Sequence, residues 1–157
     1  MADVTDKQRN PRDPDTGNPV LDAYRLEEQI GFLLRKANQS HTQLFGQLMP
    51  GDLTPTQFAV IAKLYELEIV SQNRLGRLTS MDVATVKGVI DRLRERGIAS
   101  TRKDSEDKRR LLVELTKAGR SLAEETIPYG IKITEANLNP LTSEEQSQLT
   151  ELLKKIS

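Results

Sequence analysis

Basic side chains gather in one stretch of the chain, residues 71–110, where their spacing suits contacts to phosphates and base edges. This stretch holds eleven basic and six acidic side chains, a net charge of +5, although the whole chain of 157 residues has a formal charge of zero. A local basic face on a neutral protein is an adequate footprint for a phosphate backbone. A solvated charged surface would explain any single run of these residues, but it explains their concentration less well.

Two helical patterns and two strand-like runs organise this stretch. A short helix begins at Ser71, and after a turn a second helix spans 81–96 and ends at Gly97, a typical stop residue. The runs Ile98–Arg102 and Leu111–Leu115 flank a charged loop, which predicts a β-hairpin. The order helix, turn, helix, hairpin can place a helix in a major groove and a basic hairpin beside it.

The candidate DNA contacts lie on the outward side of both helices and on the hairpin. Small residues on the second helix permit close approach, and Thr85 can exchange hydrogen bonds or place its methyl group against a thymine. A helix N-terminus and arginines contact phosphates, and arginine can read a narrow minor groove. The candidates are Ser71, Arg74, Arg77, Ala84, Thr85, Lys87, Gly88, Arg92, Arg102, Lys103, Lys108, Arg109 and Arg110.

Each candidate also has an ordinary structural interpretation. The outward residues of the second helix could simply form an exposed helix face, and Arg92 could pair with nearby acids. The hairpin loop could be a solvated charge run. The inward residues of the two helices are expected to be Leu75, Leu78, Val86, Val89, Ile90 and Leu93.

Helical patterns flank the central unit on both sides. Asp22 is expected to cap a long helix over 25–48, and Thr54 a helix from Pro55 to about Glu68. After the hairpin, a helix over 116–127 is followed by Pro128, which we expect to interrupt or kink it, and the apolar pattern then continues to residue 138. A capping box of Thr142 and Glu145 opens a last helix.

The predicted fold is therefore mainly α-helical with a small β-hairpin wing. Residues 1–20 are expected to form a disordered arm and residues 21–157 a single domain. Within that domain, 53–116 would be the winged helix-turn-helix lobe, with helices in 21–50 and 117–157 beside it. Those outer helices would leave apolar surface exposed in one chain, so a second copy is the expected cover.

Several classes of protein are disfavoured by composition. The chain has no cysteine, which excludes disulfides, thiolate catalysis and cysteine-based zinc sites, and its single histidine disfavours a histidine-rich metal site. No phosphate loop or catalytic motif points to an enzyme, so neither catalysis nor a cofactor is expected. No apolar run reaches membrane-spanning length and no secretory signal is present, which predicts a cytoplasmic protein.

An ordered series of motifs resembles one family. The series is Leu53-Thr54-Pro55-Thr56-Gln57-Phe58, then Met81-Asp82-x-x-Thr85-Val86, Ile90-Asp91-Arg92-Leu93-x-x-x-Gly97, Asp107-x-Arg109 and Val113-x-Leu115-Thr116. Together they are similar to the MarR-type winged-helix transcriptional regulators over roughly residues 50–120. The family motif also suggests that Asp107 and Arg109 pair to hold the wing loop, which would make Arg109 partly structural.

The resemblance implies a homodimer whose outer helices interlock and whose two lobes bind a palindromic operator on double-stranded DNA. Recognition helices would enter successive major grooves, and the wings would reach the flanking minor grooves. Family members usually repress, and many release DNA when a small aromatic acid or a related compound binds. The alternatives are a regulator that binds DNA constitutively and one controlled by a protein partner.

Four residues of the first helix are candidates for holding such an effector. An arginine and a histidine near aromatic rings could bind an anionic aromatic ligand, a small aromatic acid or its CoA thioester. The surrounding run resembles the first helix of regulators of aromatic-acid catabolism. The ordinary interpretation is a pair of core phenylalanines, a surface arginine and a satisfied histidine. The candidates are Phe32, Arg35, His41 and Phe45.

Overall fold

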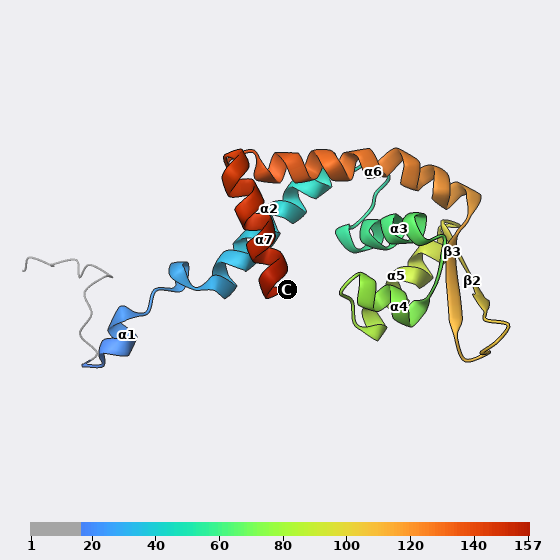
Figure 1. The fold of residues 1–157 in the computed structure, drawn as a ribbon, viewed down its shortest axis with the longest axis horizontal. Coiled ribbons are helices and arrows are strands. Elements are labelled where there is room, and N and C mark those ends of the chain that lie inside the picture. The colour runs from blue at the N-terminus through green and yellow to red at the C-terminus, as the bar shows by residue number, and fades with distance from the viewer. Residues whose placement is uncertain (1–16) are drawn as a thin grey trace, which may run out of the picture. The chain divides into compact units, whose positions relative to one another are not determined.

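The computed structural model describes residues 17–157, and these residues form two compact units (Figure 1). The first unit comprises the described residues up to Gln39, and the second comprises Ser40–Ser157. Helix α2 (Ile30–Leu48) contributes residues to both units. Within the described chain no helix is both long and apolar enough to span a bilayer.

The N-terminal unit begins with a short helix that composition did not suggest. Helix α1 (Pro19–Ala23) is capped by Asn18, whose side chain accepts a hydrogen bond from the Val20 amide at 3.0 Å. Proline at the first helical position completes this start signal. Of the arm expected over residues 1–20, the part up to residue 16 lies outside the described residues, and Pro19 and Val20 are helical.

The predicted helix over 25–48 with Asp22 as its cap is wrong at its start. Asp22 lies inside α1, a 3₁₀ turn η1 (Leu26–Glu28) follows, and α2 begins only at Ile30. The backbone is extended at Arg25 and Gln29, which separates these elements. The Gln29 side chain donates to the Arg25 carbonyl at 2.8 Å and stabilises this interruption.

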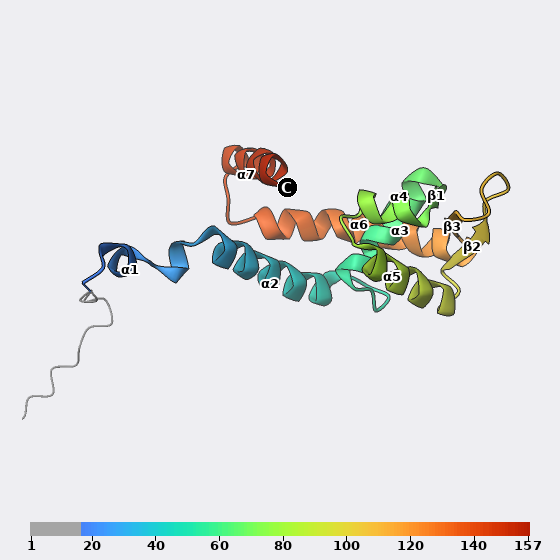
Figure 2. The same cartoon turned by 90° about the horizontal axis from the view of Figure 1, so that it is seen from below.

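The second unit contains the helix-turn-helix and the helices that support it. Helix α3 (Pro55–Leu67) starts with the predicted Thr54 cap, completed into a capping box by Gln57. Helix α4 (Gln72–Leu78) and helix α5 (Val83–Glu95) are the predicted pair, and α5 ends before Gly97 with its φ of 69°. Figures 1 and 2 show α6 (Lys117–Leu138) running alongside α3, with which it is in contact.

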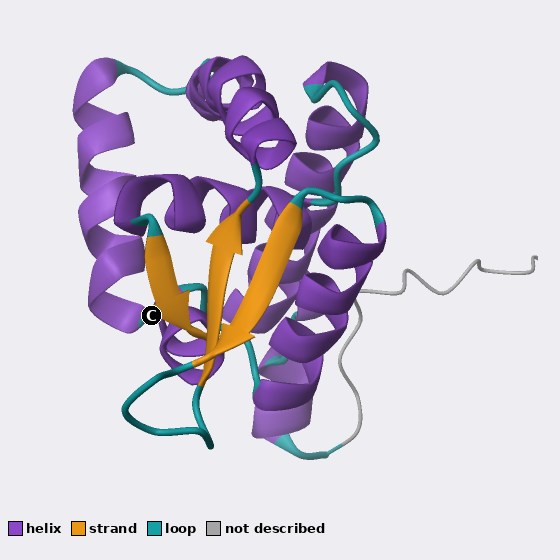
Figure 3. Cartoon of the chain, turned by 90° about the vertical axis from the view of Figure 1, so that its right-hand side faces the viewer, coloured by secondary structure: helices purple, strands orange, loops and turns teal. Residues whose placement is uncertain are grey.

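The wing belongs to a three-stranded sheet (Figure 3). Strands β2 (Ala99–Lys103) and β3 (Leu111–Leu115) form the predicted hairpin, with Thr101 opposite Val113. A third strand, β1 (Ile69–Ser71), pairs antiparallel with β3, so that the strand order is β1-β3-β2. A strand of three residues has too little alternation to be recognised in the sequence, and Ser71 also serves as the cap position of α4.

One face of α5 forms the centre of the core. Its predicted inward residues Val86, Val89, Ile90 and Leu93 are all at most 2% exposed. They pack with buried residues of the neighbouring elements, which are Val60, Ile61 and Leu64 of α3, Leu75 of α4 and Val113 of β3.

The prediction that Leu78 points inward is wrong. Its side chain is exposed because α4 ends there. The chain turns at Thr79, whose hydroxyl donates to the Leu75 carbonyl at 2.8 Å.

The two C-terminal helices start at the predicted caps. Thr116 accepts a hydrogen bond from the Gly119 amide at 3.0 Å, and α6 then continues through Pro128, so the expected interruption does not occur. Helix α7 (Ser143–Ile156) opens with the predicted capping box of Thr142 and Glu145. The exposed apolar side chains of this helix are Leu149, Leu152, Leu153 and Ile156.

The first turn of α6 sits directly on the backbone of residue 98, which gives a test of the fold. A Cβ atom added at Gly119 would lie 2.0 Å from the Ile98 carbonyl oxygen, whereas one added at Gly46 in α2 would meet nothing within 4 Å. We expect Gly119→Ala to lower the free energy of unfolding by about 2–3 kcal/mol. Gly46→Ala, the control, should raise it by about 0.5–1 kcal/mol. Urea denaturation measures both, and equal stabilities would contradict this packing.

Candidate nucleic-acid interface

The N-terminus of α5 is built around one carboxylate. Asp82 caps the helix by accepting the Thr85 amide and the Thr85 hydroxyl, each at 2.8 Å. These hydrogen bonds from Thr85 hold the pKa of Asp82 below its ordinary value of 3.8. The hydroxyl hydrogen of Thr85 is thereby committed to Asp82, so the exposed Thr85 offers its methyl group and a lone pair to a partner.

The outward face of α5 carries the other predicted residues. Ala84 and Lys87 are exposed, and Lys87 pairs with Asp91 one turn later at 2.7 Å. Arg92 is also exposed, and it forms no ion pair with any residue in the described range 17–157. The pairing proposed for Arg92 as an alternative is therefore not present, while Lys87 must exchange Asp91 for a phosphate to contact DNA.

Gly88 occupies this face without an internal reason for being glycine. A Cβ atom there would meet nothing within 4 Å of the surrounding chain. Glycine inside a helix costs about 0.5–1 kcal/mol relative to alanine. Packing inside the chain does not demand this residue, and a glycine on an exposed helix face leaves room for a close approach to a partner.

A polar hollow of about 480 Å³ lies between the start of α4 and the base of the wing. It brings together four of the predicted residues, Ser71, Arg77, Arg109 and Arg110. Three guanidinium groups around a hollow of this kind suit a phosphate group. Gln72 and Asn73 also line it, and their position directly after the Ser71 cap was the signal that could have identified them.

Arg74 and Ser71 relate differently to this hollow. Arg74 is exposed on α4 but does not line the hollow. Ser71 stands at the cap position of α4, yet its side chain makes no capping hydrogen bond. The Ser71 hydroxyl is therefore available to the hollow.

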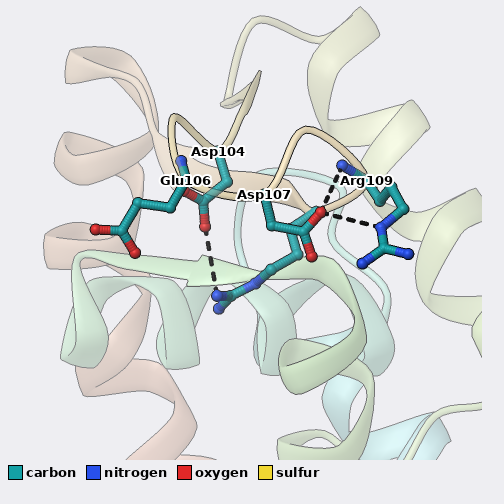
Figure 4. A network of polar contacts seen from close by, with 5 residues as sticks. Asp104, Glu106, Asp107 and Arg109 are labelled. Carbon is teal, nitrogen blue, oxygen red and sulfur yellow. Dashed lines mark hydrogen bonds and ion pairs between the residues drawn. The ribbon is translucent and has the colours of Figure 1, made fainter.

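The wing loop is held by two acid–base pairs (Figure 4). Asp107 accepts from the Arg109 amide at 3.0 Å and from Arg109 Nε at 3.2 Å, which is the pairing that the motif predicted. Asp104 lies 3.5 Å from a guanidinium nitrogen of Arg110 and accepts the Glu106 amide at 3.0 Å. The Arg109 side chain nevertheless remains 93% exposed. Arg109 is thus anchored at its Nε and open at its outer nitrogens.

Arg102 is not brought together with the other wing residues. It lies near Glu114 at 3.9 Å and lines a separate hollow of about 320 Å³ with Glu68 and Arg120. Lys103 and Lys108 are exposed and form no ion pair within residues 17–157. The basic candidates of the wing therefore divide between the loop and the sheet.

One exposed apolar residue at the start of α5 was not identified from the sequence as a candidate contact. Val83, the first residue of α5, is 65% exposed beside the Asp82 cap. It lines a hollow of about 250 Å³ between α4 and α5 together with Met81 and Arg77. An exposed valine at the start of such a helix is suited to a thymine methyl group. Its position directly after the cap was the available signal.

The effector candidates are found in both units, and each is described within its own. In the first unit, the Arg35 guanidinium lies 5.1 Å from the centre of the Phe32 ring. In the second unit, the His41 ring lies 6.1 Å from that of Phe45, and Phe45 is buried. His41 Nδ1 is also 3.0 Å from the side-chain nitrogen of Asn137, a contact that the sequence did not indicate.

Comparison with known proteins decides the family. The model of the MarR family matches residues 53–111, the helix-turn-helix and the start of the wing. The HTH-type transcriptional repressor NicR of Pseudomonas putida is 36% identical over 134 residues, which is 85% of each chain. This chain belongs to the MarR family. The predicted winged helix-turn-helix fold is confirmed by the structural likenesses.

Two solved structures of the MarR family show what relatives of this fold bind. BpsR of Bordetella bronchiseptica, whose DNA binding is regulated by 6-hydroxynicotinic acid, is 38% identical with a TM-score of 0.81, covering 85% of this chain and 96% of BpsR. The C80S mutant of MarR from E. coli, complexed with operator DNA, is 28% identical with a TM-score of 0.75, covering 81% and 92%.

Gly88 gives a test that separates folding from recognition. We expect Gly88→Ala to raise the free energy of unfolding by about 0.5–1 kcal/mol, because the added methyl group meets nothing in the chain. The same methyl group should weaken operator binding by roughly tenfold, since one displaced hydrogen bond to a base edge is worth about that much. Denaturation and fluorescence anisotropy measure the two effects. An unchanged operator affinity would show that Gly88 does not contact the operator.

Proposed function

We propose that this protein is a homodimeric transcriptional repressor that binds a palindromic operator and leaves it when a small aromatic acid binds. The observation that carries the proposal is the hollow where the start of α4 meets the wing and three arginines converge. Its position beside the exposed face of α5 matches what a duplex requires, phosphate contacts next to a helix that reads base edges. The MarR relative solved in complex with operator DNA supports DNA as the partner.

In this mode α5 enters a major groove and the wing loop reaches the adjacent minor groove. Ala84, Thr85 and Gly88 face the bases, with Lys87 and Arg92 toward the phosphates. Arg109 extends from the loop with its outer nitrogens free, because Asp107 holds only its amide and its Nε. A guanidinium in that position suits the negative potential of a narrow minor groove.

A second copy of the chain is the partner that the apolar surface of each unit supports. In the first unit Val20, Leu21 and Ile30 are 60–74% exposed. In the second unit α7 exposes Leu152 and Ile156 to a similar degree. Exposed apolar faces of this kind mark interaction surfaces, and a two-fold dimer pairs the same faces of both copies. Two lobes would then meet two half-sites about one DNA turn apart.

The effector is proposed to be an aromatic acid or its CoA thioester. The half-buried His41 offers a polar group beside the apolar core around Phe45. The regulation of BpsR by 6-hydroxynicotinic acid supports this chemical class. Arg35, which stacks on Phe32 in the first unit, is a further candidate for a carboxylate. The competing proposal is a regulator of the same family that binds DNA constitutively or answers to a protein partner.

Removing one wing arginine tests the DNA-binding mode. On an operator identified by protection of intergenic DNA, we expect two chains per site and a loss of roughly tenfold or more in affinity for Arg109→Ala. The slope of log affinity against log salt should shrink by about 2, one phosphate contact from each chain. Arg120→Ala removes the same charge at the separate hollow beside β1 and should change neither quantity. Near-normal operator affinity of Arg109→Ala would contradict the proposed contact between the wing loop and the DNA.

Titration with candidate effectors distinguishes a repressor released by an aromatic acid from a regulator that binds DNA constitutively or answers to a protein partner. Operator affinity is measured with 6-hydroxynicotinate, hydroxybenzoates, hydroxycinnamates and their CoA thioesters, each at several concentrations. We expect at least one compound to weaken binding by roughly tenfold or more, the usual size of an allosteric coupling. The same compound should raise the melting temperature by binding the folded protein. If none changes either quantity, the constitutive or partner-controlled regulator is favoured.

A further inference from the structure

A single side-chain nitrogen on α6 makes two contacts that determine which ring nitrogen of His41 carries the proton. Asn137 Nδ2 lies 2.8 Å from the Ile133 carbonyl oxygen, one turn earlier on its own helix. The same atom lies 3.0 Å from His41 Nδ1 on α2. Asn137 and His41 are both half-buried, and all three residues belong to the second unit.

The contact to Ile133 fixes which way the Asn137 amide points. A backbone carbonyl can only accept a hydrogen bond, so the atom 2.8 Å from it must be the NH₂ group and not the amide oxygen. The second hydrogen of that group is directed at His41 Nδ1, which must therefore accept. A histidine that accepts at Nδ1 carries its proton on Nε2.

Protonation of both ring nitrogens would undo this arrangement. An imidazolium would place an Nδ1–H group against the Asn137 NH₂ group, two donors facing each other. The neutral ring with its proton on Nε2 is the form that keeps both hydrogen bonds of Asn137. Within the described residues His41 Nε2 has no hydrogen-bond partner, so its N–H group is available as a donor.

We propose that Asn137 is a positioning residue that fixes His41 as an Nε2–H donor, so that the effector must offer an acceptor there. This inference rests on the proposed effector-binding function of His41. A carboxylate or a ring carbonyl oxygen satisfies the donor, whereas a hydroxyl group oriented to donate is left facing an N–H group. Beside the donor lies the Phe45 ring, which is buried and packs edge-on against Phe58.

The state of the ring can be measured directly, because His41 is the single histidine of the chain. In the full-length protein with ¹⁵N-labelled histidine, the ring gives one pair of nitrogen resonances. We expect the Nδ1 resonance at the position of an unprotonated nitrogen and the Nε2 resonance at that of an N–H group. A ring protonated at Nδ1 in the wild-type protein at neutral pH overturns the inference, and this measurement needs no variant to fold.

Asn137→Asp tests whether the amide sets that state. The carboxylate cannot donate to His41 Nδ1 but can accept from it, so the proton of the neutral ring should move from Nε2 to Nδ1. Asn139→Asp, which adds the same charge two residues later at an exposed position, should leave the resonances unchanged. Asn137→Ala removes the donor without adding charge and should give a mixture of tautomers. Unchanged resonances in both Asn137 variants would overturn the inference.

The effect of Asn137 on effector recognition is measured by how well the effector releases the protein from its operator. With 6-hydroxynicotinate as the probe, the concentration that halves operator binding should rise roughly three- to tenfold in Asn137→Asp, the effect of one lost hydrogen bond. In Asn139→Asp it should not change. If the probe and the other acids fail to act on the wild-type protein, the proposed effector function fails, whereas the ring resonances still decide the role of Asn137. Normal release despite a changed tautomer would overturn the link to specificity.

Discussion

The burial of one face of α5 is the constraint on which the rest of the second unit depends. Ile90 and Leu93 are almost fully buried among residues of α3, α4 and the sheet, so α5 can neither rotate nor slide without opening the core. This fixes the direction of its opposite face, where Thr85 and Gly88 lie. Close packing holds the side chains of that face in fixed positions, as the proposed contacts to base edges would require.

Three carboxylates lie among the basic side chains of the proposed DNA-binding surface. Asp82 caps α5, and Asp107 and Asp104 shape the wing loop by accepting backbone amides and pairing with arginines. Each of them lowers the attraction for phosphate, but each also removes freedom from a long side chain or a helix end. The surface therefore has a modest net charge and ordered donors, which favours a defined binding geometry over general attraction for polyanions.

Much of the fold could be predicted because its signals are local. Capping residues such as Thr54 and Thr142, the stop at Gly97 and the period of the α5 stripe are each readable within a few residues. The errors arose where the outcome depended on distant contacts or on very short elements, as with β1 and α1. The convergence of Arg77 with Arg109 and Arg110, and the contact of His41 with Asn137, join segments far apart in sequence and required coordinates.

Few contacts separate His41 from α5, the helix that we propose contacts the operator. The Phe45 ring lies tilted beside His41 and meets Phe58 of α3 edge-on. The Phe58 ring approaches α6 so closely that a Cβ atom at Gly130 would lie 2.6 Å from it. At the other end, Arg96 after α5 donates to the Gly51 and Asp52 carbonyls in the turn that follows α2. The end of α2 is thus joined to α3 by aromatic packing and to α5 by hydrogen bonds. Because α5 cannot slide within the core, a shift of the end of α2 that kept these contacts would have to move α5 together with the elements packed around it.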